Sequence, residues 1–248
     1  MIRDPEMLEQ LLETIRNFVK NELVPLEHEV EESNAIPEHI VNQMKELGLF
    51  GLTIPEEYGG LGITMEEEIL VALELGKTSA AFRSLIGTNN GIGSSGILID
   101  GTEEQKQKYL PRYASGEYIG SFCLTEPDSG SDAASLKTTA TKDGDHYILN
   151  GTKRFITNAP RATTFTVMAR TNPEIKGASG ISAFLVEAGT PGLSLGKIDK
   201  KMGQHGSYTC DVIFDHCRVH QDQLIGGQEG IGFKTAMRVL DKGRLHIA

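Results

Sequence analysis

The sequence predicts an α+β protein: an N-terminal helical bundle, a middle β-barrel or sandwich, and the first helix of a truncated C-terminal helical bundle. Residues 4–113 are rich in Glu, Leu, Lys and Gln, with apolar side chains at helical spacing. Residues 118–225 are rich in Thr, Val, Ile, Phe and Gly, with the short alternations and turn signals of strands. Helical spacing returns from residue 233 and runs to Ala248 without a cap, so we expect this helical domain to continue. The expected domains are residues 1–117, 118–226 and 227–248.

The first helices are bounded by local signals. Asp4 followed by Pro5 is a typical helix start, and Leu, Ile and Phe then repeat every three or four residues. Pro25 should kink or end this helix, because proline lacks a backbone N–H and clashes with the preceding turn. A second helix is expected over residues 37–47, and Gly48 should end it.

Two capping boxes predict further helices. Thr64 with Glu67, and Thr102 with Gln105, have the spacing at which each side chain can bond the other residue's backbone N–H. Residues 80–99, between these two starts, are apolar with interspersed small side chains. We expect them to form one buried helix.

Short apolar runs in the second part predict strands at residues 146–149, 164–168, 181–186 and 211–214. Turn signals separate them at residues 143–145, 150–151, 189–192 and 203–206. Strands of this length with frequent turns are typical of a small barrel or sandwich.

The acidic composition disfavours several classes of partner. The formal net charge is -10 and the pI is about 5.2, without the clustered Lys and Arg that nucleic-acid binding requires. No run of 18 apolar residues predicts a membrane span, and residues 1–5 lack the apolar segment of a signal peptide. We therefore expect a cytoplasmic protein that binds a small molecule.

Cysteines and histidines give no sign of a metal site. Cys123, Cys210 and Cys217 are odd in number and lack metal-ligand spacing, so we expect buried, reduced thiols. Histidines without a nucleophile partner are more often surface residues than catalytic ones. This applies to His205, His216 and His220.

Residues 91–96 match the GxGxxG pattern of dinucleotide-binding proteins. The pattern has that meaning only between a strand and a helix of a βαβ unit. Here it lies within the helical part, so small residues that permit close packing are the better interpretation.

Two polar segments could carry chemistry. Residues 121–132 and 153–158 each combine a strand end and Thr hydroxyls with a turn. In the first turn Pro127 fixes φ, Asp128 and Ser129 can bond their own backbone, and Gly130 can adopt positive φ. Such a turn leaves backbone N–H groups available for an anion or a heteroatom-rich ring. An ordinary Thr-bearing turn is the simpler interpretation without further context.

The order and spacing of four segments supply that context. PEEYGG at residues 55–60, TEPDSGSD at 125–132, NGTKRFITN at 150–158 and LDKGR at 240–244 resemble the acyl-CoA dehydrogenase family, across essentially all 248 residues. The resemblance implies a flavoprotein oxidoreductase of fatty acid β-oxidation that binds FAD and converts an acyl-CoA thioester to the trans-2-enoyl-CoA. It also implies an electron-transfer flavoprotein as acceptor and a homo-oligomer, either dimer or tetramer.

The resemblance places the flavin at the two polar segments. Thr125 and Thr157 would hydrogen bond to the isoalloxazine edge, and Phe155 would pack on the ring. Many relatives have Trp in place of Phe155 and Tyr in place of Phe122, so aromatic packing is kept while a polar contact is lost. The full cofactor-binding set is Phe122, Cys123, Leu124, Thr125, Gly130, Ser131, Phe155, Ile156 and Thr157.

The resemblance also implies contacts to the substrate. Ser131 would touch the pantetheine arm, and Asp241 and Arg244 match positions that hold the CoA moiety. An exposed i, i+3 ion pair is the alternative interpretation of Asp241 and Arg244. In the family the helix matched by residues 85–93 sets part of the acyl pocket floor. Asn89 is bulkier than the Gly of some relatives, which favours a short or branched acyl chain.

The reaction needs a base for the α-proton while the β-hydride passes to flavin N5. In the family this base is a Glu of the C-terminal helical domain, in a minority at the position of Gly243. Glycine cannot abstract a proton, so we expect the base beyond Ala248 and no catalytic residue in this chain, which alone should be inactive. Turn and capping roles explain Glu126 and Asp132.

Other functions of the same scaffold stay open. An acyl-CoA oxidase, a desulfinase-like relative, or a catalytically silent flavoprotein that serves as a binding module would share these residues. A Glu late in the domain after Ala248 would favour a dehydrogenase. Rapid peroxide formation by the reduced flavin would indicate an oxidase.

Overall fold

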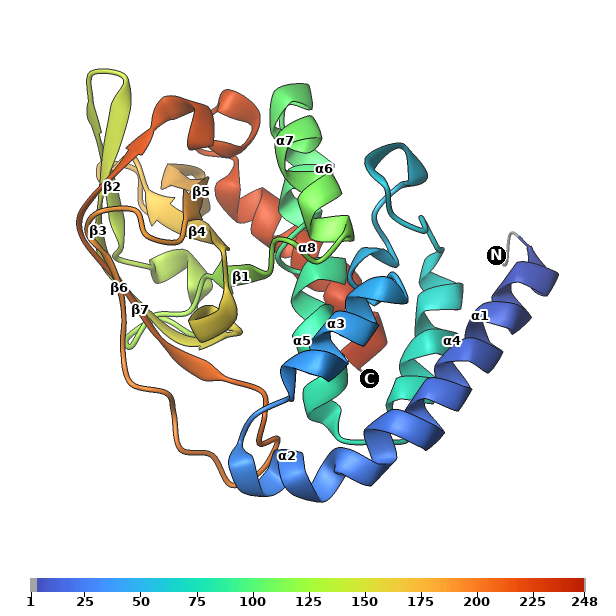
Figure 1. Ribbon diagram of the computed structural model, residues 1–248. Coiled ribbons are helices and arrows are strands. Elements are labelled where there is room, and N and C mark those ends of the chain that lie inside the picture. Colours follow the sequence, from blue (N-terminus) through green and yellow to red (C-terminus); the bar gives the residue numbers. More distant parts are fainter. Residues whose placement is uncertain (1–3, 248) are drawn as a thin grey trace.

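The computed structural model describes residues 4–247, apart from the side chain of His246. The expected outer domain limits, residues 1 and 248, therefore lie outside the described residues. Figure 1 shows a helical part, a curled sheet beside it, and a last helix that passes between the two. The predicted order of helices, strands and a final helix is confirmed. No helix within residues 4–247 is long and apolar enough to cross a membrane.

Most helix boundaries follow the predicted signals. The Asp4 side chain accepts a hydrogen bond from the backbone N–H of Met7, and both predicted capping boxes are formed. Around Pro25 the chain stays helical but passes through a π turn, Val19–Leu23, and a 3-10 turn, Val24–Leu26, which kink it. The α-helices are α1 (Pro5–Phe18), α2 (Glu27–Ser33), α3 (Glu38–Glu46), α4 (Met65–Leu75), α5 (Ala80–Asn90), α6 (Ser95–Asp100), α7 (Glu103–Ala114) and α8 (Gly232–Ile247).

The single helix expected over residues 80–99 is wrong, because α5 ends at Asn90 and α6 begins at Ser95. The glycine-rich run between them forms a turn, with Gly91 at φ -121° and ψ -107°. A Cβ on Gly93 would lie 2.8 Å from the carbonyl oxygen of Thr88 and 3.2 Å from Cα of Gly120. The GxGxxG match is thus a close contact between helix and strand backbones, as the packing interpretation predicted.

The second part is one curled mixed sheet, the half-barrel form of the predicted barrel or sandwich. Its order is β1-β4-β2-β3-β7-β6, and β5 pairs with β4. β1 and β2 pair with β4 in parallel, whereas the other pairs are antiparallel. The strands are β1 (Gly120–Cys123), β2 (Thr139–Asp143), β3 (His146–Thr157), β4 (Thr164–Arg170), β5 (Ile181–Glu187), β6 (Leu193–Leu195) and β7 (Thr209–His220).

The turn predicted at Asn150 and Gly151 is wrong, since both residues lie inside β3. The register with β7 shifts between Leu149 and Gly151, which marks an irregularity rather than a chain reversal. Gly151 has φ +150°, and a Cβ there would lie 2.4 Å from Oγ1 of Thr138. The glycine therefore permits a close approach between β3 and the residues before β2.

Packing of α8 determines where a site can form. α8 contacts β4 and β5 of the sheet as well as α4 and α6 of the helical part. Ala236 and Val239 of α8 are buried in a core shared by the sheet and α6 and α7. The end of α8 reaches the level of α5, and a cleft opens between these two helices.

Candidate functional site

The ends of β1 and β3 lie side by side. The backbone N–H of Arg154 donates to the carbonyl oxygen of Thr125 at 2.8 Å. The Ser121 hydroxyl donates to the carbonyl oxygen of Thr157 at 2.7 Å. The structure thus brings together the two polar segments singled out from the sequence, although about thirty residues separate them.

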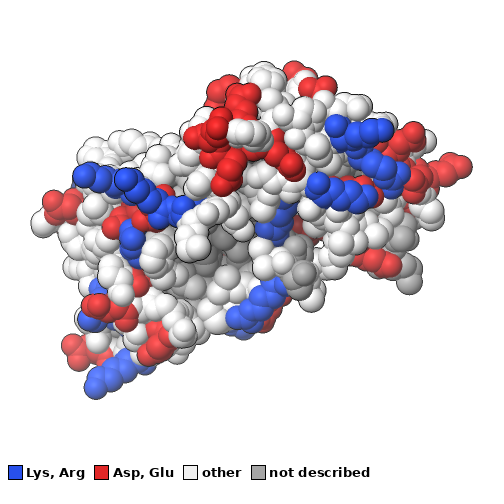
Figure 2. All heavy atoms as spheres, turned by 90° about the horizontal axis from the view of Figure 1, so that it is seen from below, with Lys and Arg blue, Asp and Glu red and all other residues white. Residues whose placement is uncertain are grey.

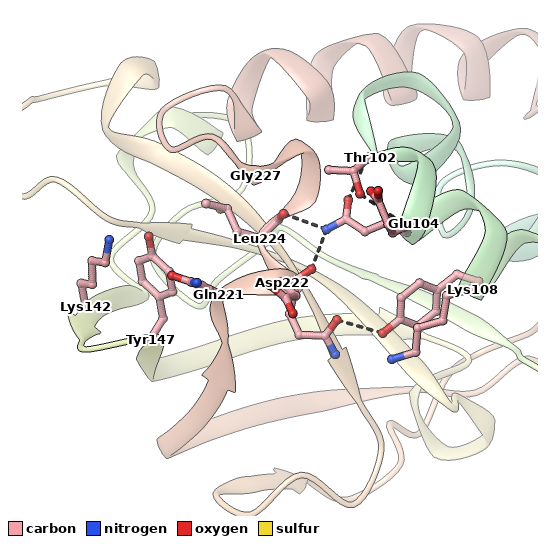
Figure 3. A pocket seen from close by; sticks show the side chains of 12 residues that line it. Thr102, Glu104, Lys108, Lys142, Tyr147, Gln221, Asp222, Leu224 and Gly227 are labelled. Atoms are coloured by element: carbon pink, nitrogen blue, oxygen red, sulfur yellow. Dashed lines mark hydrogen bonds between the residues drawn. The ribbon is translucent and has the colours of Figure 1, made fainter.

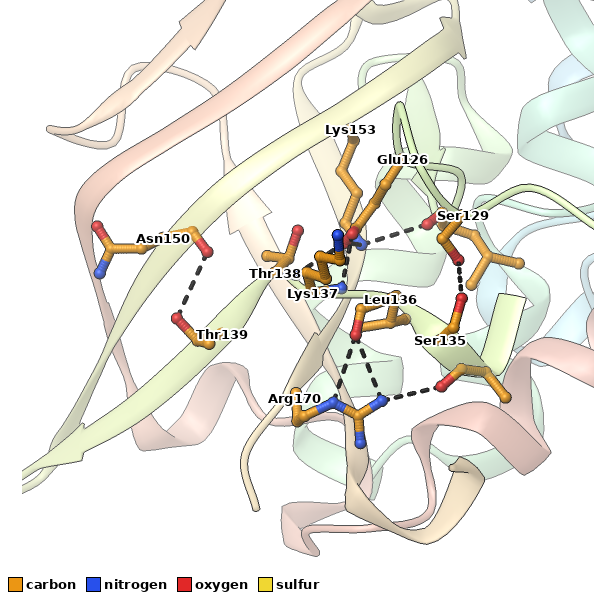
Figure 4. A network of polar contacts seen from close by, with 12 residues as sticks. Glu126, Ser129, Ser135, Leu136, Lys137, Thr138, Thr139, Asn150, Lys153 and Arg170 are labelled. Carbon is orange, nitrogen blue, oxygen red and sulfur yellow. Dashed lines mark hydrogen bonds and ion pairs between the residues drawn. The ribbon is translucent and has the colours of Figure 1, made fainter. Parts of the chain in front are cut away.

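A buried ion pair joins the two segments beneath their surface (Figure 4). Lys153 is fully buried, and its Nζ lies 2.8 Å from Oε1 of Glu126. The same ammonium donates to the carbonyl oxygen of Leu124 at 3.3 Å. The Glu126 carboxylate also accepts the backbone N–H groups of Lys137 and Thr138, at 2.6 and 2.9 Å. One buried pair therefore fixes the turn after β1 to both β3 and the entry of β2.

Charge interactions favour the ionised form of Glu126. Burial acts to raise the pKa of Glu126, but Lys153 and the hydrogen bonds outweigh it, so the pKa lies below its usual value. Burial lowers the pKa of Lys153, and Glu126 opposes that shift. The carboxylate of Glu126 is thus occupied by structural contacts. This agrees with the turn interpretation of the residue rather than a role as base.

The predicted cofactor-binding residues differ in what they can offer a ligand. The side chains of Phe122, Cys123, Leu124 and Ile156 are buried in the core, so a ligand could meet only their backbone. The others are half-buried or exposed, namely Thr125, Gly130, Ser131, Phe155 and Thr157. The accessible part of the predicted set is therefore concentrated at the two loop ends.

Phe155 is held in an unusual conformation. Its φ is +60°, which is rare for a bulky side chain and costs roughly 1–3 kcal/mol. The ring is 61% exposed, and the Arg154 guanidinium lies 4.4 Å from its centroid. Arg154 is itself anchored to Asp211 at 2.7 Å and Asp199 at 3.0 Å. An exposed aromatic ring kept in a strained backbone indicates a surface shaped for a flat partner.

The hydroxyls of Thr125 and Thr157 complete this surface. Within residues 4–247 neither hydroxyl takes part in a hydrogen bond, although their backbone carbonyls do. A Cβ on Gly130 would meet nothing within 4 Å, so the turn beside them is open. Free hydroxyls, an open turn and an exposed ring fit the edge and face of an isoalloxazine.

A cleft of about 450 Å³ lies between α5 and α8 and borders this surface at Thr157. Three cationic side chains line it, Arg83, Lys201 and Arg244, whereas its described lining includes no Asp, Glu or His. Figure 2 shows a hollow on the lower face of the molecule with Lys and Arg side chains at its borders. In a chain of net charge -10 such a cleft favours an anionic ligand. Its other lining residues are Ser84, Gly87, Thr88, Ile92, Gln204, Ser207, Thr209, Leu240, Gly243 and Ile247.

Asp241 and Arg244, which were expected to hold CoA, form an exposed i, i+3 ion pair with each other. This pair was the alternative interpretation of the two residues. Nη1 of Arg244 lies 2.8 Å from Oδ1 of Asp241, and both side chains are 71% exposed. Arg244 nevertheless also lines the cleft. Gly243, which the sequence resemblance matched to the position of the base in a minority of the family, lines the cleft as well.

In the sequence, the size of Asn89 favoured a short or branched acyl chain. The position of the Asn89 side chain in the structure contradicts that reason. This side chain is fully buried and does not line the cleft. It donates to the carbonyl oxygens of Tyr113 and Tyr118 and accepts the backbone N–H of Gly120. The residues of α5 that do face the cleft include Arg83 and Gly87, which the sequence did not single out.

A larger cavity, of about 690 Å³, lies at the start of α7 beside the β2–β3 hairpin (Figure 3). None of the predicted site residues lines it. The Gln105 amide inside it donates to the carbonyl oxygens of Asp222 and Leu224 and is fully engaged in joining α7 to the segment after β7.

The three cysteines are free and buried, as predicted. Burial raises the pKa of Cys210 and of Cys217 to about 11. These thiols are therefore packing residues rather than nucleophiles.

Comparison with known proteins gives consistent results. The family model for the acyl-CoA dehydrogenase N-terminal domain matches residues 5–117, and the one for the acyl-CoA dehydrogenase middle domain matches residues 121–217. The acyl-CoA dehydrogenase of Bacillus subtilis (strain 168) is 43% identical over 234 residues, which are 94% of this chain and 61% of that protein. The mitochondrial short-chain specific acyl-CoA dehydrogenase of Homo sapiens is 41% identical over 244 residues, 98% of this chain and 59% of that protein.

A solved structure is similar over the whole chain. Butyryl-CoA dehydrogenase from Megasphaera elsdenii superposes with a TM-score of 0.93 at 35% identity, over 100% of this chain and 65% of that one. The chain spans about 60% of the length of the two sequence relatives it matches.

Proposed function

The chain belongs to the acyl-CoA dehydrogenase family, and on that premise we propose that it forms the flavin- and thioester-binding part of an FAD-dependent acyl-CoA dehydrogenase. The reaction would be the α,β-dehydrogenation of an acyl-CoA thioester to the trans-2-enoyl-CoA. One observation carries the proposal. The surface formed by Thr125, Phe155 and Thr157 meets a cationic cleft at Thr157, so a flat ring and an anionic thioester could lie against each other.

FAD fits the residues at the two loop ends. When bound, it would supply the acceptor for the β-hydride, at flavin N5. The free hydroxyls of Thr125 and Thr157 can donate to the ring edge, and Phe155 can pack on its face. Gly130 and Ser131 lie in the open turn, where backbone N–H groups can approach closely. The buried pair Lys153–Glu126 would keep both loop ends in register for this contact.

The cleft is suited to the anionic part of CoA. Arg244 and Lys201 line it, and Asp241 would orient Arg244 through their ion pair. Ser131, in the open turn, would contact the pantetheine arm. Guanidinium and ammonium groups are the usual protein ligands of phosphate. We therefore assign Ser131, Asp241 and Arg244 to the substrate.

The α-proton requires a base that this cleft lacks. None of its described lining residues is a carboxylate or a histidine, and Gly243 has no side chain to accept a proton. We propose that a Glu from outside these 248 residues acts as the base. The 248 residues alone would then bind ligands without turning over acyl-CoA.

We further propose that an electron-transfer flavoprotein accepts the electrons and that the full-length protein is a homo-oligomer. A similar solved structure whose title names the electron transferring flavoprotein of Acidaminococcus fermentans supports the first assignment. The second rests on the family resemblance of the sequence.

The full-length protein tests this function directly. It should purify with FAD, and a saturated acyl-CoA added without oxygen should bleach the visible flavin band. Thr125→Val and Thr157→Val should weaken FAD binding, while Thr141→Val on the exposed side of β2 should not. Bound flavin that no acyl-CoA reduces would instead indicate a silent binding module. Rapid peroxide formation by the reduced flavin would indicate an oxidase, and acyl-CoA-dependent dye reduction by residues 1–248 would refute the external base.

A further inference from the structure

The β6–β7 loop, residues 196–208, forms one wall of the cleft between α5 and α8. Three of its residues, Lys201, Gln204 and Ser207, line the cleft. Figure 1 shows the loop leaving the sheet and reaching α2 before it returns as β7. The position of this wall therefore depends on how the loop is held against the helical part.

Two consecutive loop residues attach the loop to the end of α2. The His205 ring lies between the carbonyl oxygen of Glu31 in α2, at 3.0 Å, and that of Lys201 in the loop, at 3.1 Å. The backbone N–H of Gly206 donates to Oδ1 of Asn34, the residue that ends α2, at 2.8 Å. His205 thus joins the helical part to the loop segment that carries Lys201.

The contacts of the His205 ring in the described part of the chain are all with acceptors. Nδ1 lies within reach of the Glu31 carbonyl oxygen and 2.9 Å from its carboxylate Oε1, and Nε2 faces the Lys201 carbonyl oxygen. None of these oxygens can donate, so both ring nitrogens need a proton to make hydrogen bonds. Only the imidazolium has both protons. The neutral ring turns a lone pair toward one of the oxygens, and that contact is lost.

The groups around the ring favour the imidazolium on balance. The hydrogen bond to the Lys201 carbonyl raises the pKa of His205, and Glu31 raises it further, although burial and the positive charge of Lys201 oppose the shift. The side chains of α2 and α5 that pack on the next loop residue, Val30 and Ala81, are apolar. Protonation of His205 and attachment of the loop therefore support each other.

We propose that His205 is a positioning residue of the cleft. Its imidazolium fastens the β6–β7 loop to α2 and so holds Lys201 in the wall that meets the anionic part of the ligand. The Lys201 ammonium itself donates to the carbonyl oxygens of Gln204, at 2.9 Å, and of Ser207, so it moves with the loop. The inference rests on the proposed function, since it takes the anionic part of CoA to lie in this cleft.

Affinity for CoA should then depend on the protonation of His205. Because the folded-state pKa of His205 is raised, its contribution is complete below the usual value of 6.5 and is lost as the pH rises through the folded-state pKa. Calorimetric titration of the FAD-bound full-length protein with free CoA, from about pH 6 to about pH 9, measures the loss. The wild type should lose about fivefold in affinity relative to His205→Arg, which keeps charge and donors over this range. His205→Gln, which does not titrate, should bind about fivefold more weakly than the wild type at about pH 6 and equally at about pH 9.

Ratios taken at the same pH remove the ionisation of CoA and of Lys201, which the variants share. His28→Gln is the matched control, since His28 is an exposed residue of α2 that pairs with Glu32 of the same helix. It should follow the wild type at every pH. Trypsin cleavage after the exposed Lys200, identified by mass spectrometry, reports release of the loop without CoA. Cleavage should be faster in the wild type than in His205→Arg at about pH 9 and equal at about pH 6.

The outcomes separate the role of His205 from the function of the cleft. If free CoA binds at no pH, the assignment of the cleft and the proposed function fail, and the trypsin comparison still decides the role of His205. If CoA binds but the ratio of wild type to His205→Arg does not change with pH, or His205→Gln equals the wild type at about pH 6, the role of His205 alone is overturned. His205→Arg carries the test if His205→Gln does not fold.

Discussion

The two loop ends that face the proposed flavin and the cleft between α5 and α8 are built in different ways. Beneath the loop ends, the Lys153–Glu126 pair and the backbone bond from Arg154 to Thr125 fix the turn after β1 to β3. The walls of the cleft instead carry glycines at Gly87 and Gly243 and long cationic side chains. One region is braced from the interior by a buried ion pair, whereas the three cations that line the other are half-buried or exposed.

This difference separates two demands on the protein. A ring that exchanges hydride must be held to a fraction of an ångström, which needs supporting contacts behind the groups that touch it. The choice of acyl group needs only a lining that can vary at little cost to folding. Substitutions beneath the loop ends should therefore lower stability strongly, and substitutions in the cleft should alter binding first.

The largest effect is expected for Lys153→Met. It leaves Glu126 buried without its counter-charge, and breaking a buried pair in this way costs about 3–5 kcal/mol. The free energy of unfolding from urea denaturation measures the loss. FAD affinity should fall in parallel, because the turn after β1 loses its link to β3.

Lys137→Met is the matched control at the same turn after β1, which Lys137 contacts through Asp128. Lys137 pairs with Asp128 at 3.1 Å, but both side chains are more than 70% exposed, so the cost should stay below about 1 kcal/mol. Equal losses for the two variants would mean that the Lys153–Glu126 pair is no stronger than a surface contact.

Glycine-to-alanine substitutions should act with opposite sign at a tight backbone contact and in the cleft wall. In Gly93→Ala, between α5 and α6, the new Cβ would meet the backbone of Thr88 and of Gly120 in β1, and overpacking of this kind costs about 1–3 kcal/mol. Gly87→Ala in α5 has room, and replacing a helical glycine should stabilise the protein by about 0.5–1 kcal/mol. Thermal unfolding of both variants tests the contrast. Destabilisation by Gly87→Ala would show that the cleft wall is packed as tightly as the contact at Gly93.

Local signals predicted much of the helical part. Both capping boxes, at Thr64 and Thr102, join residues that are three positions apart. Such an interaction can be predicted from the local sequence, because it does not depend on how distant segments pack. The dipeptide Asn150–Gly151 was misleading because its usual turn competes with a long strand paired on both sides, and the pairing prevails.

The sequence identified the two segments that form the loop ends, but it did not predict the side-chain contacts between them. Glu126 and Lys153 lie in the two recognised segments, yet their pairing depends on how β1 and β3 come together and is not visible in either segment. Arg83 was missed for a similar reason. Its neighbours across the cleft, Leu240 and Gly243, follow it by more than 150 residues, and only the packing of α8 brings them near. The prediction for Asn89 was based on the size of its side chain. Its buried hydrogen bonds instead give it a structural role between α5 and the start of β1.

Acid should weaken the braced region selectively. The folded-state pKa of Glu126 lies below its usual value of 4.5, so its stabilising contribution is complete above 4.5 and is lost as the pH falls through the folded-state pKa. Glu126→Gln lacks this ionisation. The difference in unfolding free energy between wild type and Glu126→Gln should be constant from pH 7 to about pH 5 and shrink below the usual pKa. A difference that does not change on acidification would show that the charge of Glu126 contributes nothing.

The smallest effect on stability is expected for Arg244→Gln. This variant separates the contribution of a cleft residue to folding from its contribution to CoA binding. The pair of Arg244 and Asp241 is exposed and spaced i, i+3, so its loss should cost no more than about 0.5 kcal/mol. If Arg244 holds the anionic part of CoA, the same change should weaken binding of free CoA about tenfold at low salt, with a smaller loss at high salt because ions screen exposed charges. Urea unfolding and calorimetric titration with CoA at two salt concentrations measure the two quantities separately. A variant that loses stability but keeps its CoA affinity would make Arg244 an ordinary surface ion pair, and the cleft would then owe its anion preference to Arg83 and Lys201.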